Sequence, residues 1–149
     1  MARASQARAG MSALARQKMA LIVHPDLTML SRYQALLTRA EFSTVVARDI
    51  PTALMAITQH YFEVAIISSQ LGESGDGWPL AGVFHLVFPK SFVSVIVPGA
   101  DLLNLQTAIN NGVQEIFEED HAPDAVVSAI LTATAIPATP SARNRSRLQ

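Results

Sequence analysis

The stretch Met19-Ala20-Leu21-Ile22-Val23-His24-Pro25-Asp26 sets a pattern that the middle of the chain repeats. Five apolar residues in a row are typical of a strand that is covered on both faces. His24-Pro25 ends this run, and the Asp26 carboxylate can cap the helix that follows. Apolar residues recur in that helix at helical spacing: Met29, Leu30, Tyr33, Leu36 and Leu37. The stretch therefore predicts one strand followed by one helix.

Four further strand and helix pairs follow the first. The expected strands cover residues 42–47, 64–67, 92–97 and 113–117. The expected helices begin after Asp49, at Trp78, after Asp101 and at Pro123. The apolar residues expected to face inward from these helices are Ala53, Leu54 and Ile57, then Leu80, Val83, Phe84 and Val87, then Leu102, Leu105 and Ile109, and last Val126, Val127, Ile130 and Leu131. We also expect Trp78 to belong to the core.

This alternation predicts an α/β fold with a parallel sheet and helices on both faces. Because crossovers are right-handed, few topologies remain, and the flavodoxin-like (βα)5 doubly wound sheet with strand order 2-1-3-4-5 is the commonest at this size. Ligands of such sheets sit beyond the carboxyl ends of the strands. The segments expected there are His24-Pro25-Asp26, Arg48-Asp49, Ser68-Ser69-Gln70, Pro98-Gly99 and Glu118-Glu119-Asp120.

The composition favours one globular domain. The chain has 149 residues, of which 50% are hydrophobic and 15% charged, and it has no cysteine. These values exclude a disordered chain, a disulfide scaffold and a thiolate metal site. No apolar run approaches the roughly 20 residues that a membrane-spanning helix needs, and the run at 19–23 is too short for a signal-peptide core. We therefore expect a cytoplasmic protein.

Charge is divided unevenly along the chain. Residues 1–18 and 139–149 hold basic residues and no acid, so all 12 acids lie between them. We expect a domain at 18–134 between mobile basic tails at 1–17 and 135–149, because the tails lack a sustained apolar period. The tails can be electrostatic arms for nucleic acid or anionic surfaces, or simply solubilising ends. Translation starting at Met11 or Met19 would also explain the first tail.

Several local patterns stand at consistent spacing within 18–134. Ala20–Val23 is followed by a turn, Ala65–Ser69 is followed by a loop and Asp76-Gly77-Trp78, and Asn111–Glu115 precedes the last strand, with Pro123 opening the last helix. Together they resemble the receiver domain of bacterial response regulators. The resemblance implies a signalling module with a phosphate-accepting pocket at the carboxyl edge of its sheet.

A working receiver builds that pocket from four elements. An aspartate after the third strand accepts phosphate, two acids after the first strand help to hold Mg²⁺, and a Ser or Thr after the fourth strand and a Lys after the fifth bind phosphoryl oxygens. In the same order, the resemblance places these elements on Ser69, on His24 and Pro25, on Pro98 and on Glu119. The aromatic switch position of the fifth strand falls on Ile116, one place before Phe117.

None of these residues fits the corresponding chemistry. A serine hydroxyl cannot form an acyl phosphate, and proline offers Mg²⁺ no carboxylate oxygen. Pro98 lacks both a hydroxyl and a backbone donor, and Glu119 puts a negative charge where phosphate needs a positive one. We therefore predict a degenerate member, a pseudo-receiver that has lost aspartyl phosphorylation and has no catalytic residue, no metal and no cofactor.

Other candidate sites have weaker support. Ser69, His24 and Asp26 could in principle form a Ser-His-Asp hydrolase site, but no Gly-x-Ser-x-Gly elbow surrounds the serine. The glycines of Gly72-x-x-Gly75-x-Gly77 lack the lysine of a phosphate-binding loop, which favours a flexible turn. Phosphorylation of Ser69 itself would need a separate serine kinase. Acids that could gather around a cation are Asp26, Glu73, Asp76 and Glu119, although loop acids are usually caps; the histidines without ligand spacing are His60, His85 and His121.

These observations predict a stand-alone signalling protein that is not an enzyme and acts by phosphorylation-independent protein–protein contact. The resemblance implies a homodimer or a partner complex through the face of the fourth helix, fifth strand and fifth helix. That face would present Gln106, Asn110, Gln114 and Glu118. Two alternatives stay open: a small-molecule sensor that uses the altered pocket, and nucleic-acid or anionic-surface binding through the tails.

Overall fold

The fold is a five-stranded parallel sheet in the order β2-β1-β3-β4-β5, which confirms the predicted topology. The computed structural model describes residues 18–135, so the expected tails lie outside the described residues except for Ala135. The strands are β1 (Met19–Val23), β2 (Ser43–Ala47), β3 (Val64–Ser68), β4 (Phe92–Val97) and β5 (Glu115–Glu118). The last strand begins two residues later than the sequence predicts.

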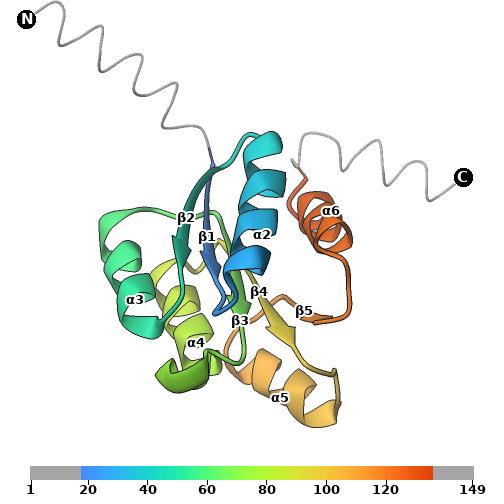
Figure 1. Ribbon diagram of the computed structural model, residues 1–149. Coiled ribbons are helices and arrows are strands. Elements are labelled where there is room, and N and C mark those ends of the chain that lie inside the picture. The colour runs from blue at the N-terminus through green and yellow to red at the C-terminus, as the bar shows by residue number, and fades with distance from the viewer. Residues whose placement is uncertain (1–17, 136–149) are drawn as a thin grey trace, which may run out of the picture.

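Helices cover both faces of the sheet (Figure 1). They are α2 (Leu27–Arg39), α3 (Ile50–Gln59), α4 (Trp78–Val87), α5 (Leu102–Asn110) and α6 (Pro123–Ala133), with a short 3₁₀ turn, η1, at Gly72–Ser74. One core contains residues of α2 and α6, and the other contains residues of α3, α4 and α5. Within the described residues, no helix has the length and apolar character that crossing a bilayer requires.

The central strands divide their side chains between the two cores. Leu21 and Ile67 face the α3, α4 and α5 side, whereas Ile22 and Ile66 face the α2 and α6 side. Alternate side chains of a strand point to opposite faces, so a strand between two helix layers must be apolar throughout. β1 and β3 meet this condition, and they occupy the middle of the sheet.

Three carboxylates begin helices at the carboxyl edge of the sheet, as predicted. Asp26 accepts a hydrogen bond from the Thr28 N–H (2.7 Å), and Asp101 accepts one from the Asn104 N–H (2.8 Å). Asp49 caps α3 in the same way. These bonds satisfy backbone donors that no helical carbonyl can reach. Each helix therefore starts close to the end of the preceding strand.

The inward face predicted for α5 is wrong. Leu102, Leu105 and Ile109 are 80%, 48% and 77% exposed, and Ala108 is the buried residue of the helix. The reason lies at the end of the helix, where the Asn111 side chain lies against Gly82 of α4 and the Val113 N–H donates to the Ala108 carbonyl. Periodicity identifies an apolar stripe, but these contacts decide which side of the helix faces the sheet.

The inward face of α4 is only partly as predicted. Leu80, Phe84 and Trp78 are buried, which confirms the core position of the tryptophan. Val83 and Val87 are exposed, contrary to the prediction, and Leu54 of α3 is also more exposed than expected. The sheet accepts one stripe of a helix, and the larger aromatic residues of α4 occupy it.

The aromatic cluster of Phe62, Phe84 and Phe88 on the buried side of α4 allows a direct test of this packing. Phe84 is fully buried and its ring centroid lies 5.0 Å from that of Phe88. We expect Phe84→Ala to lower the free energy of unfolding by about 3–5 kcal/mol, because it leaves a cavity. Leu86→Ala, on the exposed side of the same helix, should change it by less than about 0.5 kcal/mol. Urea denaturation measures both values, and equal effects would contradict the assignment of the buried face.

Candidate functional site

The predicted site residues meet at the carboxyl edge of the sheet. His24 donates its backbone N–H to the Ala47 carbonyl, Ser69 donates to Ile96, and Glu119 donates to Val97. Each of the three therefore continues the sheet ladder one residue beyond its strand. Parallel strands bring these positions to one edge, as the sequence predicts.

Ser69 is held at the centre of this edge by its backbone. Its N–H donates to the Ile96 carbonyl (2.8 Å), and its carbonyl accepts from the Gly77 N–H (2.9 Å). A Cβ at Gly77 would lie 2.0 Å from the Ser68 carbonyl oxygen, so no side chain fits there. Glycine at 77 thus permits the close approach that returns the chain from Ser69 to α4.

The loop between Ser69 and Gly77 is a hydrogen-bonded turn. Gln70 and Asp76 form an antiparallel bridge, and the Leu71 N–H donates to the Gly75 carbonyl. The Asp76 carboxylate accepts from the Trp78 N–H (2.9 Å) at the start of α4. The three glycines therefore serve the turn and the close approach of the backbone.

The segment after β1 offers no carboxylate pair. The Asp26 N–H donates to His24 Nδ1 (3.1 Å), and Arg48 donates to the Pro25 carbonyl through Nε (3.1 Å) and Nη2 (2.9 Å). The Pro25 carbonyl oxygen is therefore already hydrogen-bonded to the Arg48 guanidinium. A divalent cation would meet a positive charge here instead of the oxygen ligands it prefers.

The His24 imidazole is partly buried, and this changes its titration. Burial lowers the pKa of His24 below its ordinary value of 6.5, although the carboxylates of Asp26 and Glu119 act in the opposite direction. Burial disfavours the charged form of a histidine. The bond that Nδ1 accepts from Asp26 also needs this nitrogen without a proton.

The four acids weighed as a cation site do not form one. Among residues 18–135, no group of three or more His, Cys, Asp or Glu side chains could hold a metal ion. Asp26 and Asp76 instead accept backbone hydrogen bonds beside helix starts. The structure therefore gives these two acids capping roles.

The positions expected for the hydroxyl, the lysine and the switch aromatic lie after β4, after β5 and within β5. Pro98 is exposed after β4, and Glu119 is exposed after β5. Ile116, at the switch position, packs against the core of α3, α4 and α5, whereas Phe117 is buried in the core of α2 and α6. The aromatic ring thus lies on the other side of the sheet from the switch position.

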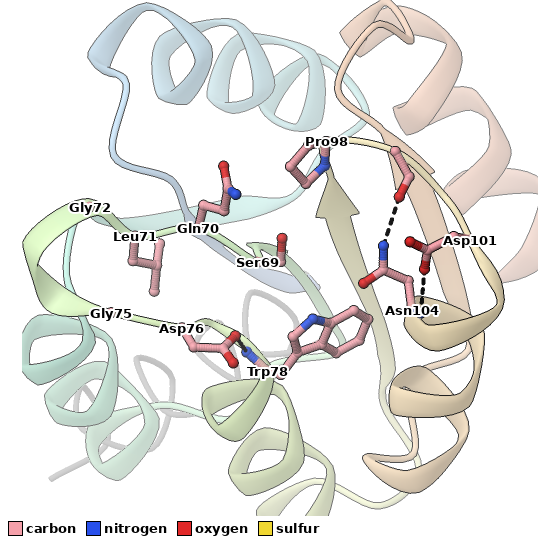
Figure 2. A pocket seen from close by; sticks show the side chains of 11 residues that line it. Ser69, Gln70, Leu71, Gly72, Gly75, Asp76, Trp78, Pro98, Asp101 and Asn104 are labelled. Carbon is pink, nitrogen blue, oxygen red and sulfur yellow. Dashed lines mark hydrogen bonds between the residues drawn. The ribbon is translucent and has the colours of Figure 1, made fainter.

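A cavity of about 870 Å³ opens beside Ser69, between the loop before α4 and the loop before α5. Figure 2 shows Ser69, Trp78 and Asn104 around this space. Its lining residues are Ser69, Gln70, Leu71, Gly72, Gly75, Asp76, Trp78, Pro98, Gly99, Asp101 and Asn104. Sequence reasoning missed Leu71 and Asn104, because their roles depend on the separation of two loops. The sensor alternative did imply a cavity at this edge.

The polar face expected for a partner is partly engaged within the protein. Gln106 and Asn110 are exposed on α5. Gln114 uses its amide internally, since its oxygen accepts from the Val93 N–H (2.7 Å) and its nitrogen donates to the Ser91 carbonyl (3.3 Å). Glu118 is half-buried and accepts from the Ala100 N–H. Only the α5 residues leave their side chains free for a partner.

Comparison with known structures agrees with this architecture. A CheY-like response-regulator receiver domain protein from Methanospirillum hungatei is 21% identical, with a TM-score of 0.71 over 78% of this chain and 92% of that chain. The chain has the receiver fold. The signal receiver domain of an HD domain-containing protein from Pseudomonas fluorescens is 23% identical, with a TM-score of 0.69 over 78% of this chain and 94% of that receiver chain.

A third known structure is similar over most of the chain. A response regulator from Burkholderia pseudomallei, whose structure contains a phosphorylated aspartate and a calcium ion, is 15% identical, with a TM-score of 0.69 over 88% of this chain and 74% of that chain. No family model matches the present sequence, and no curated protein matches it. The likeness to receivers is thus one of fold.

The close approach of the Gly77 and Ser68 backbones predicts that no residue larger than glycine is tolerated at position 77. We expect Gly77→Ala to lower the free energy of unfolding by about 1–3 kcal/mol, because the added methyl group collides with the Ser68 backbone. Gly99→Ala is the control, since nothing lies within 4 Å of its Cβ position. Thermal and urea denaturation measure both. A tolerated Gly77→Ala would contradict the geometry of this turn.

The lowered pKa of His24 predicts how stability depends on pH. The unfolded chain takes up the imidazole proton near pH 6.5, before the folded protein does, so acidification from above 6.5 down to the folded pKa should reduce stability. Below the folded pKa the loss is complete. NMR titration of the His24 ring should give a pKa below 6.5, and His24→Asn should weaken the pH dependence. A ring that titrates at or above 6.5 would contradict the effect of burial.

Proposed function

We propose that this protein is a signalling module of receiver fold that acts by protein–protein contact, without aspartyl phosphorylation and without enzymatic activity. The observation that carries this proposal is that Ile96 and Gly77 hold a serine, Ser69, at the centre of the carboxyl edge, where the resemblance to receivers leads us to expect the acceptor aspartate. An acyl phosphate requires a carboxylate at that point. We further propose that the protein works in the cytoplasm.

The charges around Ser69 support the same proposal. Glu119 replaces the lysine that neutralises phosphate in receivers, and Arg48 lies where the acidic pair would hold Mg²⁺. At about 4 Å and at the effective dielectric of a protein surface, each charge of the wrong sign disfavours binding of the corresponding ion, phosphate or Mg²⁺, by about 4 kcal/mol or less. Two such reversals, together with Pro98, disfavour both ions of the phosphotransfer reaction.

The exposed side of α5 supports contact with another protein. Leu102, Leu103 and Ile109 are each at least 70% exposed, and we call them, together with Leu105, the α5 stripe. The helix from Leu102 to Asn110 contains no charged residue. We propose a second copy of this chain as the occupant, because a neutral apolar surface can meet itself without the repulsion that the acidic domain surface would cause.

Treatment with acetyl phosphate and Mg²⁺ tests the loss of phosphotransfer. We expect the intact mass of the protein to stay unchanged, since Ser69 has no carboxylate and Glu119 repels the donor. Intact-protein mass spectrometry measures this, with a phosphorylatable receiver as the positive control. A stoichiometric phosphoryl adduct would overturn the degenerate assignment.

If α5 forms the dimer interface, substitutions in the α5 stripe should prevent dimerisation without destabilising the fold. In the double variant Leu102→Gln/Ile109→Gln, each exposed side chain should change the free energy of unfolding by no more than about 0.5 kcal/mol. The wild-type chain should sediment as a dimer and this variant as a monomer. Gln106→Glu/Asn110→Glu adds charge to the same helix and should also weaken the dimer, because the two copies would then repel each other. A wild-type chain that is monomeric at high concentration would contradict the proposal.

A further inference from the structure

The cavity beside Ser69 contains polar groups that the protein leaves without a partner. Ser69 is 8% exposed, yet its hydroxyl makes no hydrogen bond within residues 18–135, although both backbone groups are bonded. Figure 2 shows the hydroxyl turned into the cavity. Trp78, also 8% exposed, lines the same space, and its indole N–H has no acceptor among the described residues. Both polar groups are accessible from the cavity, so each can form a hydrogen bond with a bound molecule.

The charge of the cavity lining has one sign. Asp76 and Asp101 are its two charged residues, and no Lys, Arg or His lines it. Each carboxylate uses one oxygen to accept a backbone N–H, from Trp78 in one case and Asn104 in the other. The second oxygen of each remains free for a ligand. This lining attracts a cation and repels phosphate.

The rest of the lining favours an organic cation over a metal ion. Trp78, Pro98 and Leu71 supply aromatic and apolar wall, and an indole ring attracts an ammonium group. No three acids or histidines of residues 18–135 converge to coordinate a metal. The cavity is open to solvent on one side, and its volume of about 870 Å³ leaves room for a small organic ligand.

We propose that this cavity binds a small organic ammonium compound. The ammonium group pairs with Asp76 and Asp101 and lies against Trp78, while a polar group of the ligand pairs with the Ser69 hydroxyl. No residue of the α5 stripe lines the cavity, although Asn104 of the same helix does. Choline binding and dimerisation are therefore measured as separate outcomes.

Trp78 provides the reporter for a direct test, since it is the one tryptophan of the chain. The full chain is titrated with choline chloride at constant ionic strength, with fluorescence and calorimetry recorded in parallel. We expect a saturable fluorescence change and a heat of binding with the same midpoint. The neutral isostere 3,3-dimethyl-1-butanol and sodium phosphate should give neither signal.

A second test uses variants that remove the negative charge of a carboxylate but still cap the helix. Asp76→Asn and Asp101→Asn retain an acceptor oxygen for the backbone N–H, and each should weaken choline binding by about tenfold. Asp26→Asn, which changes the cap of α2 outside the cavity, should leave the affinity unchanged. Absence of both signals with choline, an equal response to the neutral isostere, or full affinity in Asp101→Asn would each overturn the proposal.

Discussion

The end of β3 is the constraint on which the rest of this structure depends. Ser69 is bonded through its backbone to Ile96 on one side and to Gly77 on the other, and Gly77 approaches Ser68 too closely for any side chain. This arrangement fixes residue 69 at the centre of the carboxyl edge and starts α4 immediately beside it. The cavity follows from the same geometry, because the Ser69–Gly77 turn forms one of its walls.

The sequence predicts the sheet well because its signals are local and redundant. Apolar runs such as 19–23 and 64–67 must be central strands, and Asp26, Asp49 and Asp101 mark helix starts that the structure confirms. The orientation of α5 could not be predicted, because it depends on the contact of Asn111 with Gly82 and on the small Ala108. The sensor alternative implied a cavity at this edge, but its lining by Leu71 and Asn104 could not be predicted, because it depends on the separation of two loops.

Scaffold and chemistry are separable in this fold. The core consists of apolar strand residues and helix stripes, while the receiver chemistry depends on side chains beyond the strand ends. Ser69, Pro98 and Glu119 belong to neither core, so the identity of these residues places little demand on the packing. The described surface also carries an uncharged stripe on α5 and an acidic cavity beside Trp78. Both features suit recognition by contact.

We propose that the edge at Ser69 does not accept a phosphoryl group. Beryllofluoride with Mg²⁺ mimics the phosphorylated state of receivers, so backbone amide NMR during its addition tests the claim most directly. We expect no saturable shift of the Ser69, Gly77 or Glu119 amide resonances. A saturable shift of these three amides that requires Mg²⁺ would contradict it.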